Sequence, residues 1–481
     1  MSEQKKYDVA VIGAGVVGAL IARELSRSHI RIVWLERCND VAQGTTKANS
    51  AIVHAGFDAK PHSVKARMNV DGNRLMGQVC EELHVPFHRN GSLVVAFTEE
   101  EVGTLKSLIA RGQENGVPDL RLLSKEELHA MEPNLNADAP AALYAPTGGI
   151  VSPYELCIAA AENAVTNGAE LRRNYEVKTI DTTEEGFLLS NGAEQIAASL
   201  VINAAGVYAD KVARMIGDET FTIKPRRGEY LLLDMSMGGV VDKTIFQCPS
   251  PMGKGVLITP TVHGNVLIGP SAEDIEDKED LDTTDAGLRS IQTAVKKSVP
   301  GFAIRDVITS FTGLRAHDDK DDFIIGASEA NPRFVNVAGI ESPGLTAAPA
   351  IAKYVARLVS AILDDPPKKA DWNPIRPEPL RLREMTPAQR KALIAQNAAY
   401  GRIICRCETV SEGEILDAIH APAGARDIDG VKRRTRAGMG RCQGGFCGTK
   451  VLEILSRELG LDPTQVTKFG GESRVLVGKT K

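Results

Sequence analysis

The fold is decided by the stretch YDVAVIGAGVVG at residues 7–18. An apolar run from Tyr7 to Ile12 leads into three spaced glycines, and helical periodicity follows from Val16 to Ser26. A second apolar run, Arg31–Leu35, ends at Glu36. This order predicts a strand, a tight turn, a helix and a second strand, which together begin a doubly wound α/β domain.

Each glycine of this motif has a physical reason to be there. Gly13 permits the tight turn, Gly15 lets the backbone approach a pyrophosphate, and Gly18 lets the helix pack close to the sheet. The helix N-terminus offers N–H groups and the positive end of its dipole to the anion. Glu36 follows Gly13 by 23 residues, where its carboxylate can accept hydrogen bonds from an adenosine ribose. The motif predicts a dinucleotide site but does not separate FAD from NAD.

The bulk properties exclude several classes of protein. With 481 residues, 43% of them hydrophobic, the chain has room for two or three domains. The formal net charge of −5 gives no global basicity, so we expect no nucleic-acid partner. The most apolar helical stretch, 347–363, carries Lys353 and Arg357, so we expect no direct membrane span. Asp8 and the glycines interrupt the first apolar run, which argues against export and predicts a cytoplasmic protein.

Later segments indicate a second sheet. Residues 256–259 and 266–268 predict a hairpin of an antiparallel, substrate-binding sheet inserted into the first domain. Buried runs at 201–205 and 334–338 return the chain to the nucleotide-binding core. Prolines crowd the segment 366–400, which predicts a semi-rigid linker that wraps or spans.

Beyond Glu36 the sequence resembles the FAD-dependent oxidoreductases of the D-amino-acid-oxidase/glycerol-3-phosphate dehydrogenase superfamily, over about residues 5–365. The matching segments are TTKANS at 45–50 with HAG at 54–56, NAAG at 203–206, GLR at 313–315 with DFIIG at 322–326, and GIESPGLT at 339–346. The resemblance implies FAD as the cofactor. It implies cofactor contacts at Gly13, Gly15, Gly18, Glu36, Thr45, Thr46, Asn49, Ser50, Ala205, Gly206, Gly339, Gly344, Leu345 and Thr346.

Within this superfamily two groups are most similar to the chain. They are the glycerol-3-phosphate oxidases or dehydrogenases of the short bacterial type and the L-2-hydroxyglutarate dehydrogenases. Segments 49–58, 226–230 and 253–256 look closest to the glycerol-3-phosphate group. Both groups oxidise a secondary alcohol beside an anionic group, which needs a base, a flavin and cations.

The resemblance also implies the roles of individual side chains. His54 is the expected base, and Arg315 is the expected anion clamp, because its planar fork suits phosphate or carboxylate. Lys254, in a glycine-flanked turn, would supply a second positive charge, and Ser342 would hydrogen-bond substrate or flavin.

Plainer interpretations of these side chains stay open. Arg315 could form a core salt bridge with Asp321 or Asp322, and Lys254 could be a solvated surface residue. Ser342 and Thr346 could only cap a helix. The neighbouring Arg226 and Arg227 could steer anions or lie on a solvated edge.

Four cysteines gather near the C-terminus. Cys405 and Cys407 are separated by 34 residues from Cys442, which pairs with Cys447. Four thiolates suit zinc or an iron–sulfur cluster, and a disulfide framework is disfavoured in a cytosolic chain. The spacing, with residues 433–440, resembles the bacterioferritin-associated-ferredoxin-like [2Fe-2S] module found at the C-terminus of some bacterial glycerol-3-phosphate dehydrogenase subunits. Zinc or an empty site remains the alternative.

A basic run precedes the second cysteine pair. It consists of Lys432, Arg433, Arg434, Arg436 and Arg441. It is either a solvated helix face or a field that offsets an anionic cluster and docks a redox partner.

We therefore expect an α/β protein with a Rossmann-like FAD-binding domain, an inserted antiparallel-sheet substrate domain and a small, mainly helical iron–sulfur domain. The expected FAD-binding core covers about 1–80, 150–220 and 310–365, the substrate sheet about 81–149 and 221–309, the linker 366–400 and the iron–sulfur module 401–481.

The expected activity is oxidation of sn-glycerol 3-phosphate to dihydroxyacetone phosphate, with electrons leaving through a [2Fe-2S] cluster to a partner subunit or carrier. One alternative substrate is L-2-hydroxyglutarate or another 2-hydroxy or imino acid. An alternative of another class is an electron-transfer subunit without its own substrate. Association with a membrane is expected only through a partner.

Overall fold

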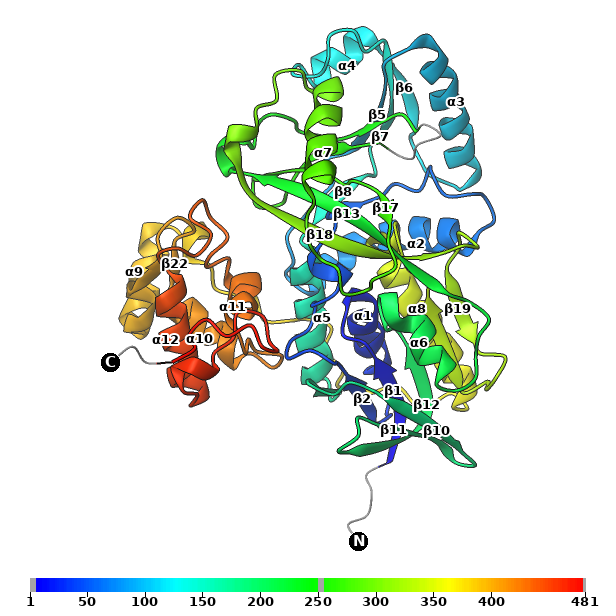
Figure 1. The fold of residues 1–481 in the computed structure, drawn as a ribbon, viewed down its shortest axis with the longest axis vertical. Helices are drawn as coiled ribbons and strands as arrows, with labels where there is room; N and C mark the ends of the chain where they lie inside the picture. The colour runs from blue at the N-terminus through cyan, green and yellow to red at the C-terminus, as the bar shows by residue number, and fades with distance from the viewer. Residues whose placement is uncertain (1–5, 250–254, 479–481) are drawn as a thin grey trace.

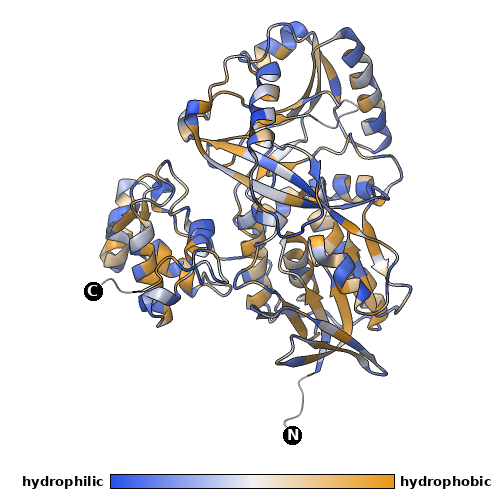
Figure 2. Ribbon diagram, viewed as in Figure 1, coloured by the Kyte–Doolittle hydropathy of each residue, from blue (hydrophilic) through white to orange (hydrophobic). Residues whose placement is uncertain are grey.

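The computed structural model describes residues 6–249 and 255–478, and its chain divides into three bodies (Figure 1). Two sheet-containing domains are stacked on each other, and a small helical module packs beside them. The strands of both sheets are mostly hydrophobic, and the helices at the outside of the molecule carry many hydrophilic residues (Figure 2). The expected α/β class is confirmed.

Eight of the described strands form the sheet of the first domain. Its order is β10-β11-β12-β1-β2-β9, with β20 paired to the C-terminal part of β12 and β19 paired to β20. The pairs β1–β2, β1–β12, β2–β9 and β12–β20 are parallel, as a doubly wound domain requires. The strands are β1 (Lys6–Ile12), β2 (Ile32–Leu35), β9 (Glu170–Arg172), β10 (Thr179–Thr183), β11 (Gly186–Ser190), β12 (Gln195–Asn203), β19 (Ile324–Ala327) and β20 (Phe334–Ala338).

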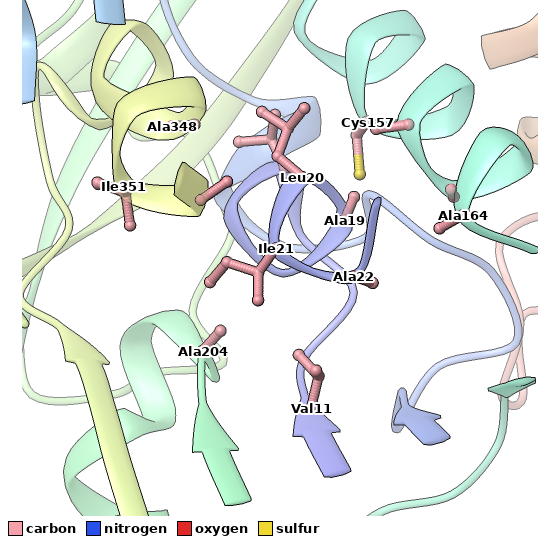
Figure 3. Packing of buried hydrophobic residues seen from close by; sticks show 14 of the residues in the cluster. Val11, Ala19, Leu20, Ile21, Ala22, Cys157, Ala164, Ala204, Ala348 and Ile351 are labelled. Carbon is pink, nitrogen blue, oxygen red and sulfur yellow. The ribbon is translucent and has the colours of Figure 1, made fainter. Parts of the chain in front are cut away.

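Helix α1 (Val16–Leu25) is the centre of this domain's packing. Small residues such as Ala19 and Ala22 let it approach the sheet at Val11 and Ala204, with α5 (Pro153–Thr166) and α8 (Gly344–Ile362) on either side (Figure 3). Helix α2 (Val64–Glu82) completes this layer beside α8, whereas α6 (Ala209–Arg214) packs Val212 against the opposite face of the sheet. By length and composition α8 could cross a membrane, but half of it is buried against α1 and α2 in this core.

The second domain is built on a sheet of nine described strands in the order β17-β13-β16-β15-β14-β5-β7-β6, with β18 beside β13. All its pairs are antiparallel except β14 and β5, which run parallel. The strands are β5 (Ser92–Ala96), β6 (Arg121–Ser124), β7 (Ala141–Ala145), β13 (Ile223–Leu233), β14 (Thr244–Gln247), β15 (Leu257–Pro260), β16 (Val266–Gly269), β17 (Glu273–Asp274) and β18 (Val307–Asp318). Helices α3 (Glu99–Glu114), α4 (Lys125–Met131) and α7 (Asp285–Ser298) cover this sheet.

Strand β18 corrects one expected boundary. Residues from 310 onward were assigned to the FAD-binding core, but β18 pairs with β13 from Ile223↔Asp318 to Leu233↔Val307. The error arose because a long strand that crosses from one domain to the other has no sequence mark at the crossing. Separately, β3 (Ile52–Val53), β4 (Phe87–His88) and β8 (Gly149–Val151) form a small three-stranded sheet.

The proline-rich segment lies as a strap along the first domain. The Pro367 carbonyl accepts a hydrogen bond from the His29 N–H, and the Arg27 guanidinium stacks on Trp372 at 4.5 Å. Further along, Arg376 forms an ion pair of 2.6 Å with Glu162 of α5.

The expected linker ends earlier than residue 400. From Leu382 onward the chain packs with the C-terminal module, because the Leu382 N–H bonds Glu414 and buried Tyr400 bonds Asp417. The module comprises β21 (Ile403–Cys405), β22 (Val410–Ser411), α9 (Pro387–Gln396), α10 (Glu412–His420), α11 (Ile428–Thr435) and α12 (Gly448–Leu459).

A buried ion-pair cluster joins the module to the first domain. Asp40, in the loop after β2, is fully buried and accepts hydrogen bonds from Arg433 at 2.9 Å and from Arg434 at 2.7 and 2.8 Å. Burial opposes ionisation, but the two arginines lower the pKa of Asp40 to about 2. Arg436 is also buried and bonds Glu408 within the module and Asn265 of the second domain. Arg433, Arg434 and Arg436 of the basic run therefore form an internal joint, whereas Arg441 is exposed and forms an ion pair of 2.9 Å with Asp234 of the second domain.

Candidate active site and cluster site

One large cavity, of about 2190 Å³, runs between the two sheet domains. It begins at the glycine turn after β1 and continues past the loop at 45–54 to the start of α8. Most predicted site residues line it: Gly13, Gly15, Glu36, Thr45, Thr46, Asn49, Ser50, His54, Ala205, Gly206, Arg315, Ser342, Gly344 and Leu345. Segments far apart in the sequence are thus brought to one site.

The glycine turn has the close contacts that the motif predicts. Gly13 has a φ of +102°, and a Cβ there would lie 2.5 Å from the Ala204 carbonyl oxygen. A Cβ on Gly18 would lie 2.1 Å from the Gly13 carbonyl oxygen, so Gly18 serves the packing of α1 and does not line the cavity. Glu36 accepts hydrogen bonds from the N–H groups of Ala14 at 2.7 Å and Cys38 at 2.9 Å. Burial raises the pKa of this carboxyl. Glu36 therefore braces the turn at the position expected for a ribose.

Polar side chains of the loop at 45–54 form hydrogen bonds with the backbone of the loop and of α1. The Thr46 hydroxyl accepts a hydrogen bond from the Val16 N–H at 2.9 Å, which ties the loop to the first turn of α1. The Asn49 amide donates to the Thr46 carbonyl at 2.9 Å and accepts from the Ala51 N–H at 2.8 Å. These residues were predicted as cofactor contacts, and in the structure their side chains shape the cavity wall.

His54 lies where this loop meets the start of α8. Its N–H donates to the Thr346 hydroxyl at 2.9 Å, and that hydroxyl donates to the Ile52 carbonyl at 3.3 Å. Its Nε2 lies 3.3 Å from the Ser342 hydroxyl, and its ring centroid lies 5.7 Å from that of Phe246. Thr346 is fully buried and positions His54. Neither Thr346 nor Ser342 caps α8, whose N-cap is Pro343.

Arg315 reaches the cavity from β18. Its guanidinium donates to the carbonyl oxygens of Arg227 at 3.1 Å and Ser271 at 2.9 Å. The alternative of a salt bridge with Asp321 or Asp322 is wrong within the described part of the chain. Asp322 instead accepts from the first N–H groups of α2, and Asp321 pairs with Lys65 at 2.7 Å.

The two neighbouring arginines on β13 are both paired with acids. Arg226 forms two hydrogen bonds, of 2.5 and 3.1 Å, with Asp274. Arg227 pairs with Glu273 and Asp280. Neither is a free solvated charge. Lys254 lies outside the described residues, although its neighbour Gly255 lines the cavity.

Three cavity residues were not predicted from the sequence. His317 Nδ1 lies 3.2 Å from a Glu341 carboxylate oxygen, and the Lys65 ammonium bonds the same carboxylate at 3.1 Å. The three side chains form an ion-pair network in which the Lys65 ammonium neutralises the Glu341 carboxylate. Strand alternation could have indicated His317, which lies two residues after Arg315 on the same face of β18.

The four C-terminal cysteines converge at one edge of the module. The Sγ atoms of Cys405 and Cys407 lie 3.7 Å apart, and those of Cys407 and Cys442 lie 4.0 Å apart. Cys447 immediately precedes α12, and its thiol contacts Cys405. A Cβ on Gly440 would lie 2.5 Å from the Cys407 sulfur, so this glycine leaves room at the site.

Hydrogen bonds favour the thiolate form at two of the four cysteines, Cys405 and Cys442. Burial raises the pKa of Cys407 to about 12, and the hydrogen bond to Cys405 raises the pKa of Cys447. The Cys447 thiol, followed by the N–H groups of Gly438 and Glu408, lowers the pKa of Cys405 to about 5. At Cys442, burial opposes ionisation, but the N–H groups of residues 444–446 donate to its sulfur and lower its pKa. Backbone N–H···S bonds of this kind are the usual surroundings of iron–sulfur ligands.

Comparison with known proteins agrees with both sites. Residues 8–358 match the family described as FAD dependent oxidoreductase, and residues 403–457 match the BFD-like [2Fe-2S] binding domain. The chain belongs to the FAD-dependent oxidoreductase family. FAD and a [2Fe-2S] cluster are its cofactors, as the sequence predicted.

Three relatives of this FAD-dependent oxidoreductase differ in their sequence identity to it. It is 49% identical over 475 residues to "Glycerol 3-phosphate dehydrogenase" of Caloramator mitchellensis, covering 99% of each chain. It is similar to the solved structure of dithionite-reduced L-alpha-glycerophosphate oxidase from Mycoplasma pneumoniae with FAD bound, with a TM-score of 0.73, 33% identity and coverage of 77% of this chain and 98% of that one. It is 28% identical to the mitochondrial L-2-hydroxyglutarate dehydrogenase of Homo sapiens, covering 73% of this chain and 88% of the relative.

The cavity of this flavoenzyme fits FAD by its chemistry. The glycine turn and the first turn of α1 offer N–H groups to a pyrophosphate, and Glu36 lies at the ribose position. At the other end, residues 340–345 bring the N-terminus of α8 to the cavity wall, and such a helix end stabilises negative charge on a reduced ring.

Proposed function

We propose that this FAD-dependent oxidoreductase oxidises sn-glycerol 3-phosphate to dihydroxyacetone phosphate and delivers the electrons, one at a time, to a partner protein. The observation that carries the proposal is that His54 and Ser342 lie within 3.3 Å of each other at the start of α8 and that Arg315 lines the same cavity. The relative of the same length named glycerol 3-phosphate dehydrogenase supports the choice of substrate.

His54 is the group that takes the hydroxyl proton. Thr346 holds its backbone, and Ser342 lies within hydrogen-bond distance of its Nε2, so the ring has a fixed position in the cavity. A positioned base of this kind contributes about 10²- to 10⁴-fold to a rate. Bound FAD supplies the acceptor for the hydride, and the [2Fe-2S] cluster supplies a one-electron route out of the protein.

Arg315 is the group that holds the substrate's anion. Carbonyl oxygens of Arg227 and Ser271 fix its guanidinium from behind, which leaves a preoriented cation at the cavity wall. The nearby Arg226 and Arg227 are already neutralised by acids, so Arg315 is the principal described cation for this task. A bidentate guanidinium contact suits a phosphate oxygen pair.

The partner and the location of the protein belong to the same proposal. A cluster that accepts single electrons serves a one-electron acceptor, so we propose a redox partner, either a second subunit or a mobile carrier. We propose a cytoplasmic enzyme that reaches a membrane only through that partner.

An anaerobic absorbance spectrum tests the function. Addition of sn-glycerol 3-phosphate should bleach the flavin bands and then the broad iron–sulfur absorption. Steady-state turnover with a dye acceptor should be much faster with glycerol 3-phosphate than with L-2-hydroxyglutarate. The reverse order would contradict the proposed substrate, and no bleaching with any hydroxy acid would indicate an electron-transfer subunit instead.

A further inference from the structure

The two loops that hold the cluster cysteines present an apolar side chain to solvent. Phe446, between Cys442 and Cys447, is 84% exposed. Its N–H donates to the Cys442 sulfur, so its ring is attached directly to a cluster ligand loop. Cys407 of the other loop is exposed as well, and its sulfur lies 4.0 Å from that of Cys442. The cluster site therefore opens to solvent beside an exposed phenylalanine.

Exposed charges on these loops have one sign. Arg406 separates Cys405 from Cys407, and Lys450 lies in the first turn of α12, four residues after Phe446. Both are exposed, and neither forms an ion pair with any residue that the structure describes. The acid in the same loops, Glu408, is buried and paired with two arginines of the module, so it contributes no negative field at the surface.

We propose that Phe446, Cys407, Arg406 and Lys450 form the docking face for an acidic one-electron carrier protein, here named the cluster face. A central apolar side chain with a charged rim is the usual anatomy of an interaction surface, and complementary charge guides a partner to it. The inference rests on the proposed function, because the carrier takes the electrons that the substrate loses.

The electron balance requires two docking events per substrate. The alcohol carbon loses two electrons and the alcohol loses two protons as it becomes a ketone. Two oxidised carrier molecules each accept one electron, and the two protons pass to water. A weak, salt-sensitive face suits such repeated encounters, because the reduced carrier must leave before the next one binds.

A pair of acceptor proteins of opposite charge tests the cluster face. The holoenzyme is reduced anaerobically, and its oxidation is followed with an acidic plant plastocyanin and, separately, with basic cytochrome c. We expect the acidic protein to react at least about tenfold faster at low salt, and this preference should fall steeply as the Debye length shrinks from about 30 Å to about 8 Å. Equilibrium binding of oxidised plastocyanin, measured by sedimentation, should show the same dependence on salt.

Two variants and two matched controls locate the face. Lys450→Glu should slow electron transfer to plastocyanin and weaken its binding, each by about fivefold to tenfold, whereas Lys106→Glu on distant α3 should change neither. Phe446→Ser should weaken binding about tenfold, whereas Phe469→Ser, at another exposed phenylalanine, should not. Iron–sulfur absorption shows that each variant keeps its cluster.

Several results would overturn the inference. If Lys450→Glu slows both acceptors equally, the cation serves the cluster and not a partner. If Phe446→Ser turns a dimer into a monomer in the sedimentation runs and leaves electron transfer unchanged, a second copy of this chain covers the face. Enzyme reduced chemically with dithionite keeps this test separate from the proposed substrate, because failure of glycerol 3-phosphate to bleach the flavin would leave the docking result standing.

Discussion

Replacement of Asp40 by asparagine is expected to release the C-terminal module from the first domain. Asp40 accepts three hydrogen bonds, of 2.7 to 2.9 Å, from two arginines and is fully buried. Asparagine keeps the shape but removes the one carboxylate that both buried guanidinium groups bond. Removal of one partner from a buried ion pair costs about 3–5 kcal/mol. If this cost falls on the docking of the module, the docking equilibrium shifts by about 100-fold to about 4000-fold, since 1.4 kcal/mol is a factor of ten.

Stopped-flow absorbance separates the two steps that Asp40→Asn should affect differently. Bleaching of the flavin by substrate should proceed at the wild-type rate, because Asp40 lies outside the cavity lining. The later decrease of iron–sulfur absorption should slow by tenfold or more, and the strap at 366–381 should become sensitive to limited proteolysis.

Asp429→Asn is the matched control for this prediction. It removes the acid of an exposed ion pair with Lys468 in the same module, which should cost less than about 1 kcal/mol. If Asp40→Asn transfers electrons to the cluster as fast as this control and resists protease equally, the ion pairs of Asp40 do not hold the module in place.

Three further changes test the cavity and the residues that shape it, and a fourth tests a buried ion pair outside it. Gly13→Ala should abolish FAD retention, because its Cβ would meet the Ala204 carbonyl and the φ of +102° disfavours alanine; absorbance of the purified protein checks this. His54→Asn should retain FAD yet slow anaerobic flavin reduction about 10²- to 10⁴-fold, and a loss under threefold would exclude His54 as the base. Thr346→Val should leave the His54 N–H unsatisfied at a cost of about 1–3 kcal/mol, seen as a lower Tm together with a lower kcat. Burial opposes ionisation of Glu155, but its hydrogen bond to His263 lowers its pKa to about 2. This carboxylate therefore adds up to about 3 kcal/mol of stability above pH 4.5, which is lost as the pH falls towards 2. Acid denaturation of Glu155→Gln should lack this pH-dependent component.

Those parts of the fold that depend on short, continuous segments could be predicted from the sequence. The segment from β1 to β2 was predicted correctly because turn, helix start and strands are neighbours along the chain. His54 and Arg315 were placed in one site through the resemblance of short segments, and the structure brings both to one cavity. The Cys405–Cys447 group was predicted because its ligand types and spacing are themselves the signal.

Contacts between distant residues could not be predicted in the same way. Asp40 and Arg434 are 394 positions apart in the sequence. A run of arginines has the same sequence pattern whether its side chains face solvent or bond a buried carboxylate. Thr346 was expected to contact the cofactor or to cap a helix, but its hydroxyl accepts from the His54 N–H and donates to the Ile52 carbonyl, which no local pattern indicates. Lys65 and Glu341 come together only because α2 and α8 pack side by side.

The strap at 366–381 has a consequence for stoichiometry. Because it ties the module covalently to the flavin domain and lies along α1 and α5, every molecule carries one cluster per flavin. A tether of this kind gives an effective concentration in the millimolar range, far above that of two separate proteins in dilute solution. Transfer inside the molecule should therefore be independent of enzyme concentration, and only the encounter with the outside acceptor should be second order.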